Sequence, residues 1–181
     1  RFAGWPMPVV VVAGNHEFDG RELNAAWPAL RELCGALGFT LLERQSLIVA
    51  GLDGRSIRFV GTVRWCDFDL WGQAKRAKAI RSGAYFQKVM AATFNGAPFD
   101  AHAVREEALA CGQWLAAALA EPTDAAATVA ITHFAPSAHS ADPRYRHNIS
   151  TSAFCNADDA LAPLADVWLH GHLHCRHDYR L

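Results

Sequence analysis

Three apolar segments of the chain each run directly into a loop that carries Asn or His, and this arrangement constrains the fold most. The first, residues 8–13, is rich in β-branched residues without polar alternation, which predicts a strand buried on both faces. Residues 128–132 and 167–169 predict two more buried strands. Because ligands gather at the carboxyl ends of strands in such sheets, we expect the three strand ends to meet at one site.

The remaining pattern predicts helices between these strands and one hairpin. Asp53-Gly54 is a strong turn signal between two apolar runs. We therefore expect an α/β fold, layered in the α+β sense, that forms one domain over residues 1–181. The expected helices are 22–37, 73–92 with a break at Ser82-Gly83, 101–120 and 154–164, and the further strands are 41–42, 47–52 and 57–63.

Composition excludes several classes of protein. The chain is 51% apolar and 19% charged, which predicts a packed core rather than disorder. Its net charge of -1 gives no sign of a nucleic-acid or anionic-membrane partner. The apolar run near the start is too short for a membrane span. The five Cys are odd in number and form no C-x-x-C pair, which favours a reducing, cytoplasmic location.

The first two strand ends carry candidate ligands that are weak when taken alone. In the sequence Gly14-Asn15-His16-Glu17, Asn offers a neutral oxygen and His an imidazole, but a turn with a surface His has the same pattern. His133 follows the second strand, where a hydrogen-bonded core residue is the simpler interpretation.

The third strand end is more specific. His170-Gly171-His172-Leu173-His174 places His172 and His174 two residues apart, so that on an extended segment both would face the same way. Gly171 would permit a backbone turn there. A cluster of imidazoles without a metal is unattractive, because protonated rings repel one another and a shared metal removes that difficulty.

Taken together and in this order, the three strand ends resemble the calcineurin-like metallophosphoesterase superfamily. Gly14-Asn15-His16-Glu17, Thr132-His133 and Gly171-His172-Leu173-His174 match its last three motifs. Residues 62–68, 133–145 and 174–180 also resemble a bacterial branch of that superfamily. The resemblance implies two facing mixed β-sheets flanked by helices, and hydrolysis of phosphate mono- or diesters at a site with two divalent metal ions, of Mn, Fe or Zn.

The resemblance also implies a role for each matching residue. Asn15, His133 and His172 would bind the second metal, and His174 the first. His16 would not bind metal but would face the scissile phosphate as a general acid. Separately from the family motifs, Arg144 and Arg146 are candidates for holding a phosphorylated substrate because guanidinium matches phosphate bidentately, although a solvated loop is favoured for at least one of them.

One departure from the family pattern matters. The motifs Asp-x-His and Gly-Asp-x-x-Asp precede Gly-Asn-His in the family, whereas residues 1–13 here contain no Asp, Glu or His. We expect an incomplete domain without its first strands, and both motifs in the gene upstream of Arg1. Two alternatives stay open: a nuclease of the same superfamily, which the near-neutral charge disfavours, and a non-catalytic interaction scaffold on the same fold.

Overall fold

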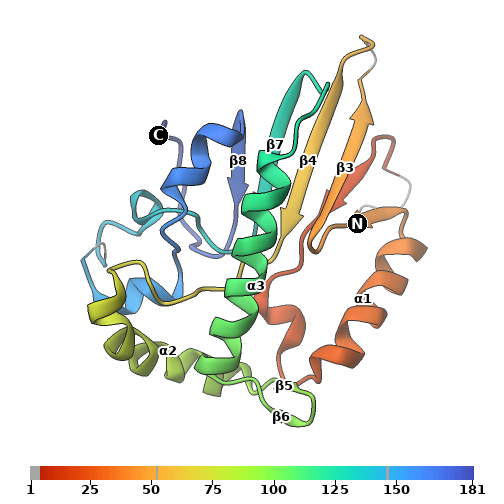
Figure 1. The fold of residues 1–181 in the computed structure, drawn as a ribbon. Helices are drawn as coiled ribbons and strands as arrows, with labels where there is room; N and C mark the ends of the chain where they lie inside the picture. Colours follow the sequence, from red (N-terminus) through yellow and green to blue (C-terminus); the bar gives the residue numbers. More distant parts are fainter. Residues whose placement is uncertain (1–4, 52, 146) are drawn as a thin grey trace.

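The structure is a computed structural model, and it describes residues 5–51, 53–145 and 147–181. Within these ranges the chain forms a mixed α/β fold in which helices pack around several small sheets (Figure 1). Parallel and antiparallel strand pairs both occur, so the coarse prediction of a layered fold that mixes the two is confirmed.

The largest sheet among the described residues has four strands in the order β3-β4-β7-β8. β3 (Gln45–Ala50) and β4 (Ser56–Thr62) form the predicted antiparallel hairpin, in which Gly54 has φ +79°. β7 (Ala127–Thr132) lies parallel to β4, and β8 (Val167–His170) lies parallel to β7. β7 and β8 therefore end at the same edge of the sheet, as predicted.

A second pair of strands packs beside this sheet. β1 (Val9–Val11) lies parallel to β2 (Phe39–Leu41), and α1 (Leu23–Ala36) connects them. A Cβ added at Gly61 of β4 would lie 2.6 Å from Cβ of Leu42 and 3.2 Å from Cγ1 of Val12. Glycine at position 61 therefore lets the two sheets approach closely.

Two strands are less buried than the sequence predicted. Each residue of β1 is only half-buried, because its sheet has just two strands. β8 lies at the edge of its sheet, where Val167 and Leu169 are 47% and 52% exposed. The predictions of a strand buried on both faces over residues 8–13 and of a buried strand over residues 167–169 were therefore wrong, because an unbroken apolar run does not show whether a second layer covers it.

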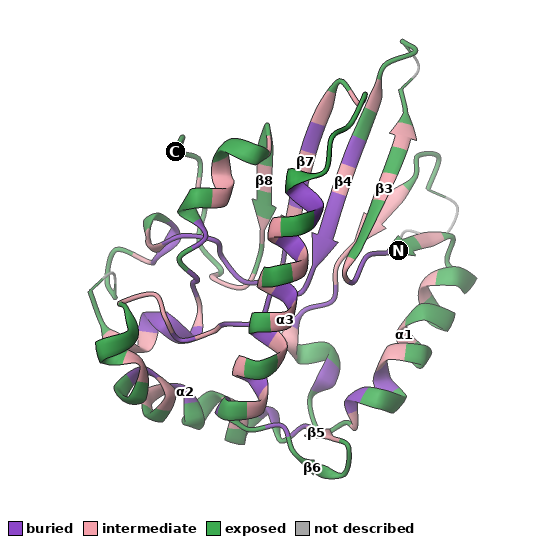
Figure 2. Cartoon of the chain, in the orientation of Figure 1, coloured by how far each residue is buried: buried purple, intermediate pink, exposed green. Residues whose placement is uncertain are grey.

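Helix α3 (Ala101–Ala120) covers one face of the large sheet (Figures 1 and 2). Asp100 caps it by accepting hydrogen bonds from the backbone N–H groups of His102 and Ala103. The buried face contains five residues that recur at helical spacing in the sequence: Val104, Ala108, Cys111, Leu115 and Leu119. The helical spacing of apolar residues was a sufficient signal for this element.

Helix α2 (Arg76–Met90) corrects a prediction, because it continues through Ser82-Gly83 without a break. A Cβ at Gly83 would lie 2.4 Å from Cε1 of the buried Phe68. The glycine is thus a site of close packing rather than a helix end.

The prediction of a helix over residues 154–164 was wrong in part, because residues 154–158 are not helical. The short 3-10 helices η4 (Ile149–Ala153) and η5 (Asp159–Leu164) flank that stretch, in which Cys155 forms a β-bridge with Ala135. The other elements are η1 (Asn15–Phe18), η2 (Gln73–Lys75), β5 (Thr93–Phe94), β6 (Ala97–Pro98) and η3 (Ala138–Ser140).

No helix in the described part of the chain has the length and apolarity needed to cross a membrane.

Candidate functional site

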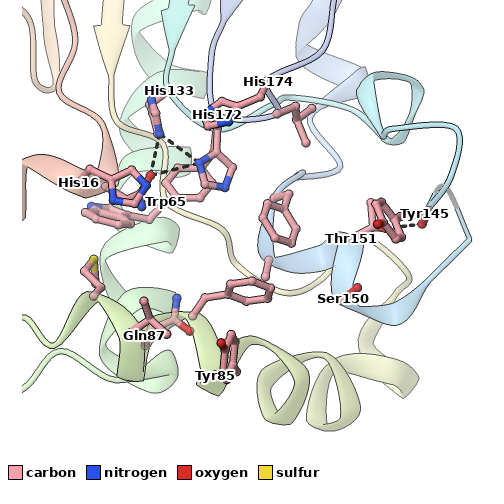
Figure 3. Close-up of a pocket in the computed structure, with 18 of the residues that line it drawn as sticks. His16, Trp65, Tyr85, Gln87, His133, Tyr145, Ser150, Thr151, His172 and His174 are labelled. Carbon is pink, nitrogen blue, oxygen red and sulfur yellow. Dashed lines mark hydrogen bonds between the residues drawn. The ribbon is translucent and has the colours of Figure 1, made fainter. Parts of the chain in front are cut away.

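The three predicted strand ends meet, and they bring one amide oxygen and two ring nitrogens together (Figure 3). Nε2 of His133 lies 2.9 Å from Oδ1 of Asn15 and 3.1 Å from Nδ1 of His172. Nδ1 of His172 lies 3.1 Å from the same Asn15 oxygen. We call Asn15, His133 and His172 the donor triad.

Hydrogen bonds alone cannot satisfy all three sides of this triangle. The Asn15 oxygen can only accept, so each short contact to it requires an N–H group on the facing ring. If both rings donate to Asn15, the two N–H groups oppose each other across the third side. If only one ring donates, a nitrogen lone pair faces the amide oxygen. A cation inside the triangle would accept all three lone pairs.

The distances also fit a metal ion. Ligand atoms about 2.1 Å from an ion and at right angles to one another lie about 3.0 Å apart. The three sides of the donor triad, 2.9, 3.1 and 3.1 Å, are close to that value. These distances are therefore compatible with one face of a coordination shell.

Burial keeps both imidazoles of the triad in the neutral form that ligates metals. It lowers the pKa of His133 to about 4 and that of His172 to about 3, because the charged ring loses its hydration. The other ring nitrogen of His172, Nε2, is buried without a hydrogen-bond partner.

Local backbone features place these side chains. A Cβ added at Gly14 would lie 2.7 Å from Cε1 of His133 and 2.9 Å from Oε2 of Glu17, so only glycine allows this approach. Beyond β8 the left-handed backbone occurs at His172 and His174, with φ +68° and +51°, and not at Gly171. The prediction that Gly171 supplies the turn was therefore wrong. Left-handed non-glycine residues are uncommon and concentrate at functional sites.

His16 lies outside the triad. It belongs to η1, its side chain is 70% exposed, and its Nδ1 is 2.7 Å from Oδ2 of Asp19. This contact orients the ring of His16, and His16 lines the same cavity as the triad. Asp19 is a residue that the sequence interpretation missed, although its position three residues after His16 in a tight turn was a usable signal.

His174 and the arginines are not joined to the triad. His174 is exposed, and it lines the same cavity without a hydrogen bond to Asn15, His133 or His172. Arg144 lines the rim of that cavity and pairs with Asp142 through Nη2–Oδ2 at 2.6 Å, which offsets its charge. Arg146 lies outside the described residues.

No carboxylate completes the site. Among residues 5–51, 53–145 and 147–181, no three His, Cys, Asp or Glu side chains gather closely enough to hold a metal ion. The donor triad reaches three ligand atoms only through the amide of Asn15. All three donors are neutral, so none of the triad's own ligand atoms would offset the charge of a divalent ion bound here.

The triad and His16 open onto a cavity of about 540 Å³. α2 and η4 form its far wall, in which Figure 3 shows Tyr85 of α2. Phe86 of α2 and Phe154, directly after η4, also line the cavity. The sequence interpretation did not identify this wall, because α2 and η4 are brought together only by the tertiary fold.

Comparisons of the chain with protein-family models, with curated proteins and with solved structures found no significant match. We therefore infer the function of the protein from the geometry of its site and from the family resemblance of the three motifs.

Proposed function

We propose that the protein is a metal-dependent phosphoesterase of the calcineurin-like kind. The observation that carries this proposal is the donor triad, in which Asn15, His133 and His172 come from three strand ends far apart in sequence and meet within 3.1 Å. The close packing of two sheets across Gly61, with helices outside them, supports the same family.

The triad would hold one of the family's two divalent ions, and His174 would contribute to the other. The oxygen and nitrogen donors suit Mn, Fe or Zn. When bound, the ions would act as Lewis acids that withdraw charge from the phosphate oxygens. Because the triad carries no charge, we expect it to hold an ion weakly. We therefore expect the protein to hydrolyse esters slowly.

His16 would carry the proton transfer. In hydrolysis, water forms a new bond to phosphorus while the bond from phosphorus to the ester oxygen breaks. The departing oxygen then needs a proton when its alcohol is a weak acid. His16 is exposed in the cavity and oriented by Asp19, so it can pass a proton to that oxygen and regain one from water.

Metal titration tests the proposal. The wild-type chain should bind up to one equivalent of Mn²⁺, measured by calorimetry and by metal analysis after dialysis. His172→Ala removes one donor of three and should weaken this binding about tenfold or more. His102→Ala changes an exposed His on α3 outside the site and should leave it unchanged.

Two results would contradict this assignment. Absence of Mn²⁺ binding in the wild-type chain would leave a scaffold as the better interpretation. Two tightly held ions would show that ligands other than the triad complete the site.

A further inference from the structure

Aromatic rings line the cavity next to the donor triad, where the alcohol part of a phosphate ester would lie. Its rings form a continuous path away from the triad. Phe154 stacks on His172 with ring centroids 5.1 Å apart at 29°, and Phe86 meets Phe154 edge-on at 4.8 Å. Tyr85 meets Phe86 edge-on at 5.5 Å and ends the path.

The rings are available to a ligand. Tyr85 and Phe86 are 69% and 37% exposed, although large aromatic side chains usually lie inside. A cavity of about 540 Å³ is large enough for a small organic molecule. Aromatic rings prefer edge-on or offset contacts with other rings, and Phe86 makes edge-on contacts with both of its neighbours in this path.

Charge is distributed unevenly around the cavity. The acidic and basic side chains Asp19, Asp142 and Arg144 lie at its His16 and loop sides, where Asp19 contacts His16 and Asp142 pairs with Arg144. The described lining residues from α2 and η4 carry none: Tyr85, Phe86, Gln87, Val89, Met90, Ser150, Thr151 and Ala153. This wall would not hold a second phosphate or a polyanion.

One polar group in the same wall has no partner. Oε1 of Gln87 is buried without a hydrogen-bond partner among the described residues, and Gln87 lines the cavity (Figure 3). A buried amide oxygen without a partner is costly, so the amide would gain by turning this oxygen toward a cavity ligand that donates a hydrogen bond.

From these observations we propose that the wall formed by α2 and η4 binds the planar aromatic ring of the substrate's alcohol, and that Gln87 accepts a hydrogen bond from a donor on that ring. The substrate class is thus a phosphate ester of an aromatic alcohol, with the phosphate at the triad. This inference rests on the proposed function for the phosphate half, whereas recognition of the ring can be tested without it.

The first experiment measures the alcohol alone, without metal. Calorimetric titration with 1-naphthol should show saturable binding at one site. Phe86→Ala should weaken it about fivefold or more, because it removes the central ring of the path. Leu109→Ala, which shortens an exposed apolar side chain on α3 outside the cavity, should leave it unchanged.

Two further variants address a folding defect in Phe86→Ala and the role of Gln87. If Phe86→Ala disturbs folding, as thermal unfolding would reveal, Tyr85→Ala at the more exposed end takes its place. Gln87→Leu should weaken binding of 5-amino-1-naphthol, which has an additional ring donor, more than that of 1-naphthol. Equal losses for the two ligands would overturn the role of Gln87. Absence of saturable binding, or unchanged affinity in folded ring variants, would overturn the aromatic site.

A second experiment separates this inference from the proposed function. With Mn²⁺, the ratio of kcat/KM for 1-naphthyl phosphate to that for glycerol phosphate should fall in Phe86→Ala. If the ring variants lose naphthol binding but no ester is hydrolysed, the aromatic site stands and the proposed function fails. If both esters are hydrolysed and the ratio does not change, the proposed function stands and the aromatic site fails.

Discussion

At the scale of single residues, His16 and Asp19 separate proton transfer from metal binding. Nδ1 of His16 lies 2.7 Å from the Asp19 carboxylate, and neither residue belongs to the donor triad. A change at His16 should therefore leave metal affinity intact, which distinguishes its role from that of His172.

His16→Ala should lower kcat for an alkyl phosphate about a hundredfold in the presence of saturating Mn²⁺. It should affect 4-nitrophenyl phosphate much less, because 4-nitrophenolate departs without a proton. Parallel rate measurements on both esters, with Mn²⁺ content determined for each protein sample, check this. Equal losses on the two esters would show that His16 does not act as the acid.

At the scale of single elements, α2 presents two different surfaces. Its buried side packs Ala79, Gly83 and Met90 toward the core, whereas Tyr85, Phe86 and Val89 remain exposed. The close approach of Phe68 to Gly83 fixes how this helix lies. The position of the aromatic wall formed by α2 and η4 thus depends on Gly83, which does not itself line the cavity.

Gly83→Ala should destabilise the protein by about 1–3 kcal/mol, because its Cβ would lie 2.4 Å from the ring of Phe68 and the core is closely packed there. Gly35→Ala is the matched control: Gly35 lies in α1, where an added Cβ meets nothing within 4 Å, and alanine there should stabilise by about 0.5 kcal/mol. Urea unfolding of the two variants measures the contrast. A shift of the same sign in both would contradict the packing argument.

At the scale of the whole molecule, the sequence predicts the elements that follow a local pattern of residues. It does not predict features that depend on packing between segments far apart in the sequence. The helical spacing along α3 and the turn at Asp53-Gly54 each identified an element correctly. Asn15, His133 and His172 could be chosen because each follows an apolar strand and because the three motifs together resemble those of a known superfamily. The exposure of β8 and the continuity of α2 could not be predicted, since neighbours distant in sequence decide both.

A buried ion pair connects the layers of the molecule, and the last prediction concerns it. Arg64, in the loop after β4, donates from Nε and Nη2 to the carboxylate of Asp158 at 2.9 and 2.7 Å. Its Nη1 donates to the backbone oxygen of Ala108 in α3 at 2.9 Å. Arg64 and Asp158 are only 4% and 8% exposed, so removal of the Asp158 charge leaves the buried Arg64 with Asp67, whose Oδ2 lies 3.1 Å from Nη2, as its remaining ionic partner among the described residues. Asp158→Asn should therefore lower the free energy of unfolding by about 3 kcal/mol or more.

Asp53→Asn, at an exposed pair in the hairpin turn, is the control and should change the urea midpoint little. The double variant Arg64→Met with Asp158→Leu should recover part of the loss, because an apolar pair has no charge to desolvate. If Asp158→Asn instead unfolds at the wild-type urea concentration, the ion pair does not hold these layers together.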